Sequence, residues 1–91
     1  MTSLEELEKL IEASLGVSPR SDTAFYYEGY LLVIDRTASA ASIVDVWGVG
    51  NVSYIPVLYR DELRYVTGDM LRQRIHEAIE RLNAYAVTKI V

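Results

Sequence analysis

The sequence contains no cysteine, only two prolines and a single histidine. Without cysteine there is no disulfide framework, and no thiolate is present to bind a metal or act as a nucleophile. The longest apolar run, Tyr30 to Ile34, has five residues, whereas a helix that crosses a bilayer needs about 20. The N-terminal segment is acidic and amphipathic, unlike a secretory signal peptide. These features predict a soluble, cytoplasmic protein with no membrane association.

Positive charge is also scarce. The formal net charge is −4, and residues 1–15 carry Glu5, Glu6, Glu8 and Glu12 against Lys9. Residues 60–81 contain equal numbers of arginines and acidic residues and are therefore neutral. Affinity for nucleic acids and for anionic membranes comes mainly from lysine and arginine, so neither is an expected partner. The low content of asparagine, glutamine and cysteine is typical of a thermophilic protein.

The amino-acid composition predicts a single small globular domain covering residues 1–91, which we expect to belong to the α+β class. Apolar residues make up 51% of the chain and charged residues 24%, which is ordinary for a globular protein and too apolar for a disordered one. A chain of this length buries enough surface to form one core without covalent cross-links. No internal repeat or linker divides it.

The first helix has clear start and stop signals. Ser3 followed by Glu6 is typical of a capping box. Gly16 stands where a left-handed residue would end the helix. Apolar residues between these signals recur at spacings of three and four and form one apolar face, namely Leu4, Leu7, Leu10, Ile11 and Leu15.

From residue 23 the pattern changes to that of strands. The segments 23–36, 41–48 and 51–59 are rich in aromatic and β-branched residues. Glu28-Gly29 interrupts the first segment, either as a tight turn between two strands or as a bulge in one long strand. Pro56 has no N–H to donate, so its strand is expected at an edge of the sheet or at a bulge. The segment 60–67 fits either a turn with a short strand or a helical turn.

A second helix is expected from Asp69 to Asn83, followed by a terminal strand over residues 84–91. Its apolar stripe consists of Leu71, Ile75, Ala78, Ile79 and Leu82. The expected fold is a two-layer α+β sandwich in the order α-β-β-β(-β)-α-β. Its antiparallel sheet would have four to five strands, and its two helices would bury their stripes against that sheet.

The stretch "DVWGVGNVSYIP" (45–56) contains two glycines that could belong to a phosphate-binding loop. Gly48 and Gly50 begin a G-x-G pattern, but the third glycine is missing and a strand follows instead of a helix. The lysine of a Walker A loop is absent as well. Gly50-Asn51 suits a two-residue hairpin turn, and we therefore interpret this stretch as a turn with no cofactor.

Three titratable residues are the candidates for chemistry. Asp35 and Asp45 become neighbours if their strands pair, and two carboxylates could then hold a divalent cation. His76, on the second helix, has Glu80 four residues later and is expected to pair with it. No second histidine or cysteine completes a metal site. The favoured interpretation assigns no catalytic, cofactor-binding or metal-binding residue, and no enzymatic activity.

The aromatic residues are the strongest functional signal, because all of them fall within or beside the expected strands. Strand alternation places about half on the face away from the helices. Exposed tyrosine and tryptophan are enriched at protein interfaces, since their rigid rings bury much area at little entropic cost. The candidate interaction surface consists of Tyr26, Trp47, Tyr54, Tyr59 and Tyr65.

Two segments also resemble a known fold. "FYYEGYLLVID", an aromatic hairpin after the first helix, and "IERLNAYAVTKIV", where Leu-Asn ends the second helix before a strand, resemble the type III secretion chaperone-like fold. That resemblance implies a small, acidic, dimeric and non-enzymatic protein that holds partner proteins on its sheet and helix surfaces. This chain is shorter than the fold usually is.

The leading hypothesis is therefore a non-catalytic protein-interaction module, chaperone- or adaptor-like, that forms a homodimer and binds a protein partner. The edge at Pro56 and the terminal strand are the candidates for pairing between chains. One alternative is a small metal- or nucleotide-dependent enzyme that uses Asp35, Asp45 and His76. Another is a small acidic inhibitor from a virus or mobile element, which would present the glutamates of the first helix.

Overall fold

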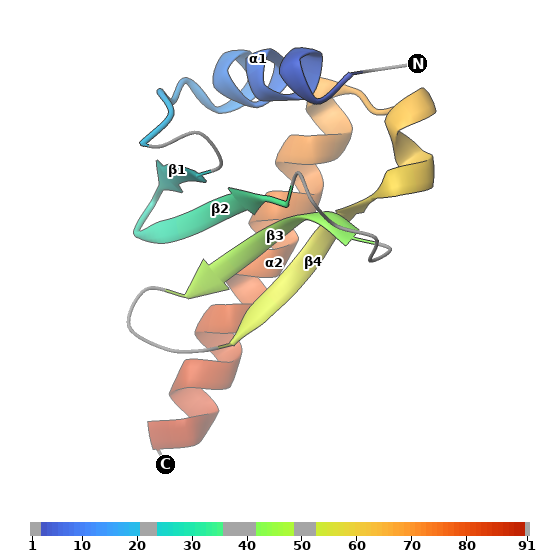
Figure 1. The fold of residues 1–91 in the computed structure, drawn as a ribbon. Coiled ribbons are helices and arrows are strands. Elements are labelled where there is room, and N and C mark those ends of the chain that lie inside the picture. Colours follow the sequence, from blue (N-terminus) through green and yellow to red (C-terminus); the bar gives the residue numbers. More distant parts are fainter. Residues whose placement is uncertain (1–2, 21–23, 36–41, 49–52, 91) are drawn as a thin grey trace.

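The computed structural model describes residues 3–20, 24–35, 42–48 and 53–90, with side chains as far as residue 84. In chain order, its elements are helix α1 (Leu4–Leu15), strands β1 (Ala24–Tyr27), β2 (Tyr30–Ile34), β3 (Ser42–Gly48) and β4 (Tyr54–Tyr59), the 3-10 helix η1 (Arg60–Arg64) and helix α2 (Gly68–Ile90). In Figure 1, α2 runs behind the sheet and α1 lies across the first turns of α2. The expected α+β class, with two helices and an antiparallel sheet of four strands, is confirmed.

The sheet is an antiparallel meander with the order β1-β2-β3-β4. Tyr27 pairs with Tyr30, so Glu28 and Gly29 form a two-residue turn and not a bulge. Both turn residues have positive φ, 50° and 82°, as in the hairpin turns whose twist matches that of the flanking strands. The other expected turn, Gly50-Asn51, lies outside the described residues. The glycine stretch nevertheless connects two antiparallel strands, β3 and β4.

Helix α1 begins and ends as its sequence predicts. The backbone N–H of Glu6 donates to the side chain of Ser3 at 3.1 Å, and the Ser3 hydroxyl donates to the Glu6 carboxylate. Gly16 adopts the left-handed conformation, with φ 66° and ψ 36°. Helix α2 differs slightly, because its N-terminal cap is Thr67 and not Asp69: the N–H of Met70 donates to the Thr67 hydroxyl at 3.1 Å.

The core lies between α2, α1 and one face of the sheet. The whole expected stripe of α2 is buried, as are Leu7 and Ile11 of α1. The sheet contributes Phe25, Leu32, Ile34, Ile43, Val44, Val46, Val57 and Leu58. Two side-chain hydrogen bonds join the sheet to α2, one between Tyr27 and His76 at 2.7 Å and one from the Tyr30 hydroxyl to Asn83.

Strand β4 is an edge strand, as Pro56 predicts, and its register against β3 shifts twice. Val44 pairs with Leu58, but Asp45 pairs with Pro56, so Val57 is an extra residue on β4. Ile43 is in turn an extra residue on β3, because Ser42 pairs with Tyr59 and Val44 pairs with Leu58, and this restores the register. Two residues in succession are therefore buried on each strand, Ile43 with Val44 and Val57 with Leu58. A strict alternation of apolar and polar residues would not produce this pattern.

The expected terminal strand at 84–91 is wrong, and so is the helix end at Asn83. Helix α2 continues to Ile90, and Tyr85 therefore lies in a helix. The segment contains β-branched residues, but no glycine or proline separates it from the helix before it. Adding residues to an existing helix is cooperative and overcomes a weak local preference for strand. Within the part of the chain that the structure describes, no helix is long and apolar enough to span a bilayer.

Candidate functional site

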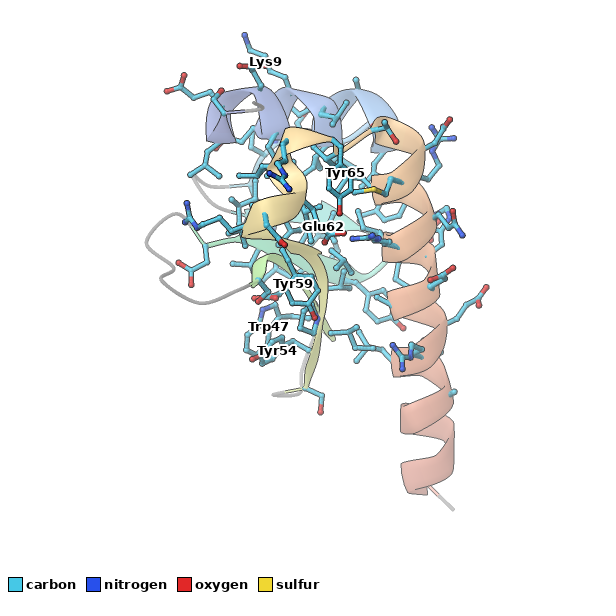
Figure 2. All side chains as sticks on the ribbon, turned by 90° about the vertical axis from the view of Figure 1, so that its right-hand side faces the viewer. Lys9, Trp47, Tyr54, Tyr59, Glu62 and Tyr65 are labelled. Carbon is cyan, nitrogen blue, oxygen red and sulfur yellow. The ribbon has the colours of Figure 1, made fainter. Side chains whose placement is uncertain are left out.

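The sheet has one face that α2 does not cover. The register places two rows of side chains there, opposite to the core residues of the same strands. We call this surface the open sheet face, and it consists of Tyr26, Leu31, Trp47 and Tyr54 in one row and of Ala24, Val33, Asp45 and Pro56 in the other. Figure 2 shows Trp47, Tyr54 and Tyr59 on the side of the sheet that points away from α2.

Aromatic rings dominate the open sheet face. Trp47 and Tyr54 are direct cross-strand neighbours, and their rings stack with centroids 4.5 Å apart and an interplanar angle of 24°. Tyr54 is 48% exposed and Tyr26 is 44% exposed. A stacked pair is held in one orientation, so a partner that binds it loses little further side-chain entropy.

A basic residue borders this face beside β1. The N–H of Arg20 donates to the carbonyl of Ala24 at 2.8 Å, and Pro19 forms an isolated bridge with Phe25. Arg20 therefore lies next to Ala24 and extends the second row of the open sheet face by one position. Its guanidinium lies over the Tyr26 ring, 5.3 Å from the centroid, in a cation–π contact that orients the charge.

Asp45 is the acidic residue within the second row. The residue is half-buried, and its Oδ1 atom is buried without a hydrogen-bond partner among the described residues. Burial raises the pKa of the Asp45 carboxyl, a hydrogen bond from Ser42 opposes that rise, and the charge of Asp35 adds to it. The open sheet face thus contains a carboxylate whose environment does not fully compensate its charge.

Some backbone groups at both edges of the sheet are already bonded. At the β4 edge, Arg74 Nη1 donates to the carbonyl of Val57 at 3.3 Å, and the N–H of Tyr59 donates to Glu62 Oε1 at 3.0 Å. Pro56 has no N–H to offer. At the other edge, residues 19–20 pair with β1. These contacts occupy some of the backbone groups that a further strand would need at each edge.

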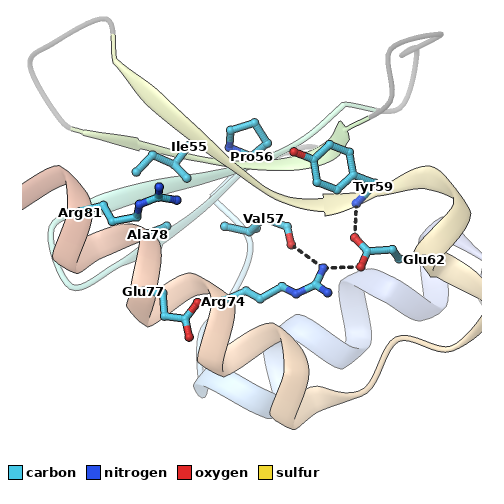
Figure 3. Close-up of a pocket in the computed structure, with 9 residues that line it drawn as sticks. All are labelled: Ile55, Pro56, Val57, Tyr59, Glu62, Arg74, Glu77, Ala78 and Arg81. Atoms are coloured by element: carbon cyan, nitrogen blue, oxygen red, sulfur yellow. Dashed lines mark hydrogen bonds and ion pairs between the residues drawn. The ribbon is translucent and has the colours of Figure 1, made fainter.

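Three of the five residues of the predicted interaction surface, Tyr26, Trp47 and Tyr54, come together on the open sheet face. Tyr59 lies at the end of β4, and Figure 3 shows its ring on the same side of that strand as Pro56. Tyr65 does not belong to this surface, because it follows η1 and hydrogen-bonds to Glu62. The sequence does not single out Arg20, because no pattern of residues indicates that positions 19–20 pair with β1.

The three residues of the enzymatic alternative do not form one site. Asp35 follows β2, two residues after Val33, which pairs with Asp45. The two carboxyl groups are close enough for the charge of Asp35 to raise the pKa of Asp45. His76 lies on the other side of the sheet, where Tyr27 and not Glu80 is its hydrogen-bond partner. Among the described residues, no three acidic or histidine side chains are arranged to hold a metal ion.

A groove of about 260 Å³ lies between β4 and α2 (Figure 3). Glu62, which is only 8% exposed, closes one end through an ion pair with Arg74 at 2.5 Å. Burial by itself raises the pKa of Glu62, but hydrogen bonds from Arg74, the Tyr59 N–H and Tyr65, together with the Arg74 charge, lower it overall. Because Arg74 already bonds Glu62 and Val57, this end of the groove contributes to structure and is not a free anion site.

Comparisons of the chain with protein-family models, with curated proteins and with solved structures found no match.

Proposed function

We propose that this protein is a non-catalytic protein-interaction module that forms a homodimer through the open sheet face. The observation that carries the proposal is the stacked pair of Trp47 and Tyr54, which stands on a sheet face that neither helix covers. Exposed apolar surface of this kind, rimmed by polar residues, marks interaction sites on soluble proteins.

The open sheet face is a better candidate for the dimer interface than the backbone edges of the sheet. Strand addition needs a row of free backbone N–H and C=O groups, whereas Pro56, Arg74 and Glu62 occupy the β4 edge. The terminal segment does not supply a strand either, because it is helical. Association between sheet faces needs no backbone groups and buries the exposed rings directly.

The chaperone- or adaptor-like role implied by the resemblance to the type III secretion chaperone-like fold belongs to this proposal, as does a cytoplasmic location. The enzymatic alternative is not proposed, because the sheet separates His76 from Asp35 and Asp45. The acidic-inhibitor alternative is not proposed, because the stacked aromatic pair, and not the glutamates of α1, stands on the uncovered sheet face.

Sedimentation equilibrium over a wide concentration range tests the proposal. We expect a dimer that dissociates on dilution, and we expect Tyr54→Ser and Tyr26→Ser each to weaken it at least about tenfold. Tyr65→Ser is the matched control, because Tyr65 is 58% exposed but lies off the open sheet face. A wild-type protein that stays monomeric at the highest concentration would contradict the proposal, as would an equal effect of Tyr65→Ser.

A further inference from the structure

The groove between β4 and α2 continues beyond the end that Glu62 closes. A second hollow, of about 540 Å³, adjoins the first, because Ile55, Pro56 and Arg81 line both of them. The rest of its lining consists of Ser53, Tyr54 and Leu82. A volume of this size lies within the range of about 300–1,000 Å³ that is typical of ligand sites. The two hollows thus form one groove, with Arg81 at their junction.

The second hollow has an apolar floor. Leu82 of α2 is buried, and Ile55 of β4 is partly buried and packs against the core. Pro56 adds a third apolar side chain. An apolar side chain that entered this hollow would lose contact with water on the sides that face β4 and α2, which favours binding.

Arg81 is the single charged residue in the lining of the second hollow. It is exposed, and it makes no hydrogen bond or ion pair with another residue that the structure describes. Glu77, one turn earlier on α2, accepts a hydrogen bond from Gln73. Figure 3 shows the Arg81 side chain directed toward Ile55 and the Glu77 carboxylate directed away from it. Arg81 therefore differs from Arg74, whose guanidinium is already bonded at the closed end.

We infer that this groove binds a short segment of a partner protein in which an acidic residue stands between apolar residues. The carboxylate of the segment pairs with Arg81, and its apolar side chains occupy the hollows on the two sides of Arg81. This inference goes beyond the proposed function, which concerns the open sheet face, and it does not depend on the homodimer.

Charge complementarity favours a carboxylate over a more highly charged group. One guanidinium forms a bidentate pair with one carboxylate. Glu77 and Glu80 lie within four residues of Arg81 on α2, and the net charge of the chain is −4. A phosphate group, with a charge of about −2, would therefore meet more negative than positive charge here. A single carboxylate is the anion that Arg81 compensates.

The groove fits an internal segment of a chain better than a chain end. It extends to both sides of Arg81, so the segment has room before and after its acidic residue. A terminal carboxylate is typically held by a nest of backbone N–H groups, whereas Pro56 at the junction has no N–H. Pro56 also leaves a gap in the hydrogen bonds of any strand added to β4, so side chains supply the contacts.

NMR titration with blocked pentapeptides tests the inference. The probe is a peptide pool, acetyl-Ser-X-Glu-X-Ser-amide, in which X is an equal mixture of leucine, isoleucine, valine and phenylalanine. We expect an apparent dissociation constant on the order of millimolar. Resonances of Ile55 and Leu82 should shift, and those of Leu31 and Val33 on the open sheet face should not. The matched pool with glutamine in place of glutamate should bind at least about fivefold more weakly.

Variants of the protein assign the effect to one side chain. Arg81→Gln should weaken binding of the glutamate pool at least about fivefold and leave binding of the glutamine pool unchanged. Arg81→Glu should prefer a pool with lysine at the central position. Arg72→Gln is the matched control, because Arg72 is an exposed arginine of α2 that pairs with Asp69 and does not line either hollow.

Three results would overturn the inference. The first is the absence of shifts at Ile55 and Leu82 at about ten times the expected dissociation constant. The second is equal affinity for the glutamate and glutamine pools, and the third is tighter binding of a pool with phosphoserine at the central position. Tyr26→Ser, which should weaken the dimer, should leave the peptide affinity unchanged. Failure of the peptide to bind is therefore a separate result from failure of the dimer to form.

Discussion

The hydroxyl of Tyr27 lies 2.7 Å from Nε2 of His76, and the two rings stack with centroids 5.8 Å apart. The contact joins the β1–β2 hairpin to the middle of α2, across 49 positions of sequence. It gives the only histidine of the chain a structural role on the covered side of the sheet. The same bond removes His76 from any site on the open sheet face.

Tyr27→Phe should lower the free energy of unfolding by about 1 kcal/mol, because it removes one hydrogen bond and leaves a half-buried nitrogen of His76 without its partner. Urea denaturation of dilute protein measures the change. Tyr26→Phe is the matched control on the neighbouring residue, whose ring lies on the open sheet face, and it should change the stability by less than about 0.5 kcal/mol. Equal losses in both variants would contradict the role assigned to the Tyr27–His76 bond.

Glu28→Asn should stabilise the protein by about 0.5–1 kcal/mol. Glu28 has φ 50°, a left-handed conformation that asparagine adopts more readily than glutamate does, and Asn-Gly is the preferred pair for this hairpin turn. The thermal unfolding midpoint should rise accordingly. Glu28→Gln removes the charge but keeps the unfavourable conformation, so a rise of the same size in that variant would show that charge and not backbone strain is responsible.

Glu62 should contribute to stability at neutral pH and lose that contribution in acid. Burial alone raises its pKa, but the hydrogen bonds from Arg74, Tyr59 and Tyr65 lower it overall. A carboxyl whose folded pKa is lowered stabilises the folded state above its ordinary pKa of about 4.3. That stabilisation disappears as the pH falls through the lowered value. Glu62→Gln should therefore cost about 1–2 kcal/mol at pH 7 and clearly less at pH 3.

Denaturation of the wild type and of Glu62→Gln at several pH values measures this difference. Glu77→Gln is the control, because Glu77 lines the same groove but is exposed. It should leave both the stability and its pH dependence nearly unchanged. A penalty for Glu62→Gln that is the same at pH 7 and pH 3 would contradict the ionised hydrogen-bonded state.

Gly68→Ala should destabilise the contact between the two helices. A Cβ atom at Gly68 would lie 2.5 Å from the Ser14 Oγ atom and 3.6 Å from the Ser14 Cβ atom, so the serine hydroxyl has to move. We expect a loss of about 1 kcal/mol by urea denaturation. In a Ser14→Ala background the hydroxyl is absent and the same substitution should cost little. A penalty that persists in that background would locate the strain elsewhere.

Local signals in the sequence predicted much of the fold. Ser3, Gly16 and the stripes of both helices have the expected roles, and Pro56 lies on an edge strand. These features depend on hydrogen bonds within one helical turn, on backbone properties particular to glycine or proline, or on the fixed periodicity of a helix. All are properties of neighbours along the chain.

The end of α2 and the partners of individual side chains could not be predicted in this way. Residues 84–90 have a mixed local preference, and the helix that precedes them decides their state. His76 had a plausible partner four residues away, yet Tyr27 of the packed sheet is the residue that bonds it. Tyr65 looked like its exposed aromatic neighbours, but η1 turns it toward Glu62.

By itself, the sequence determined that this protein has two amphipathic helices, the first of them with its caps, strands rich in aromatic residues that pair antiparallel, and no thiol chemistry. The tertiary structure decided which aromatic rings share a surface, which backbone groups at the sheet edges are bonded, and that Arg20 and Asp45 stand in one row on opposite sides of β2. The reason is physical: local conformation depends on adjacent residues, whereas a surface is composed of residues that only strand register and packing bring together.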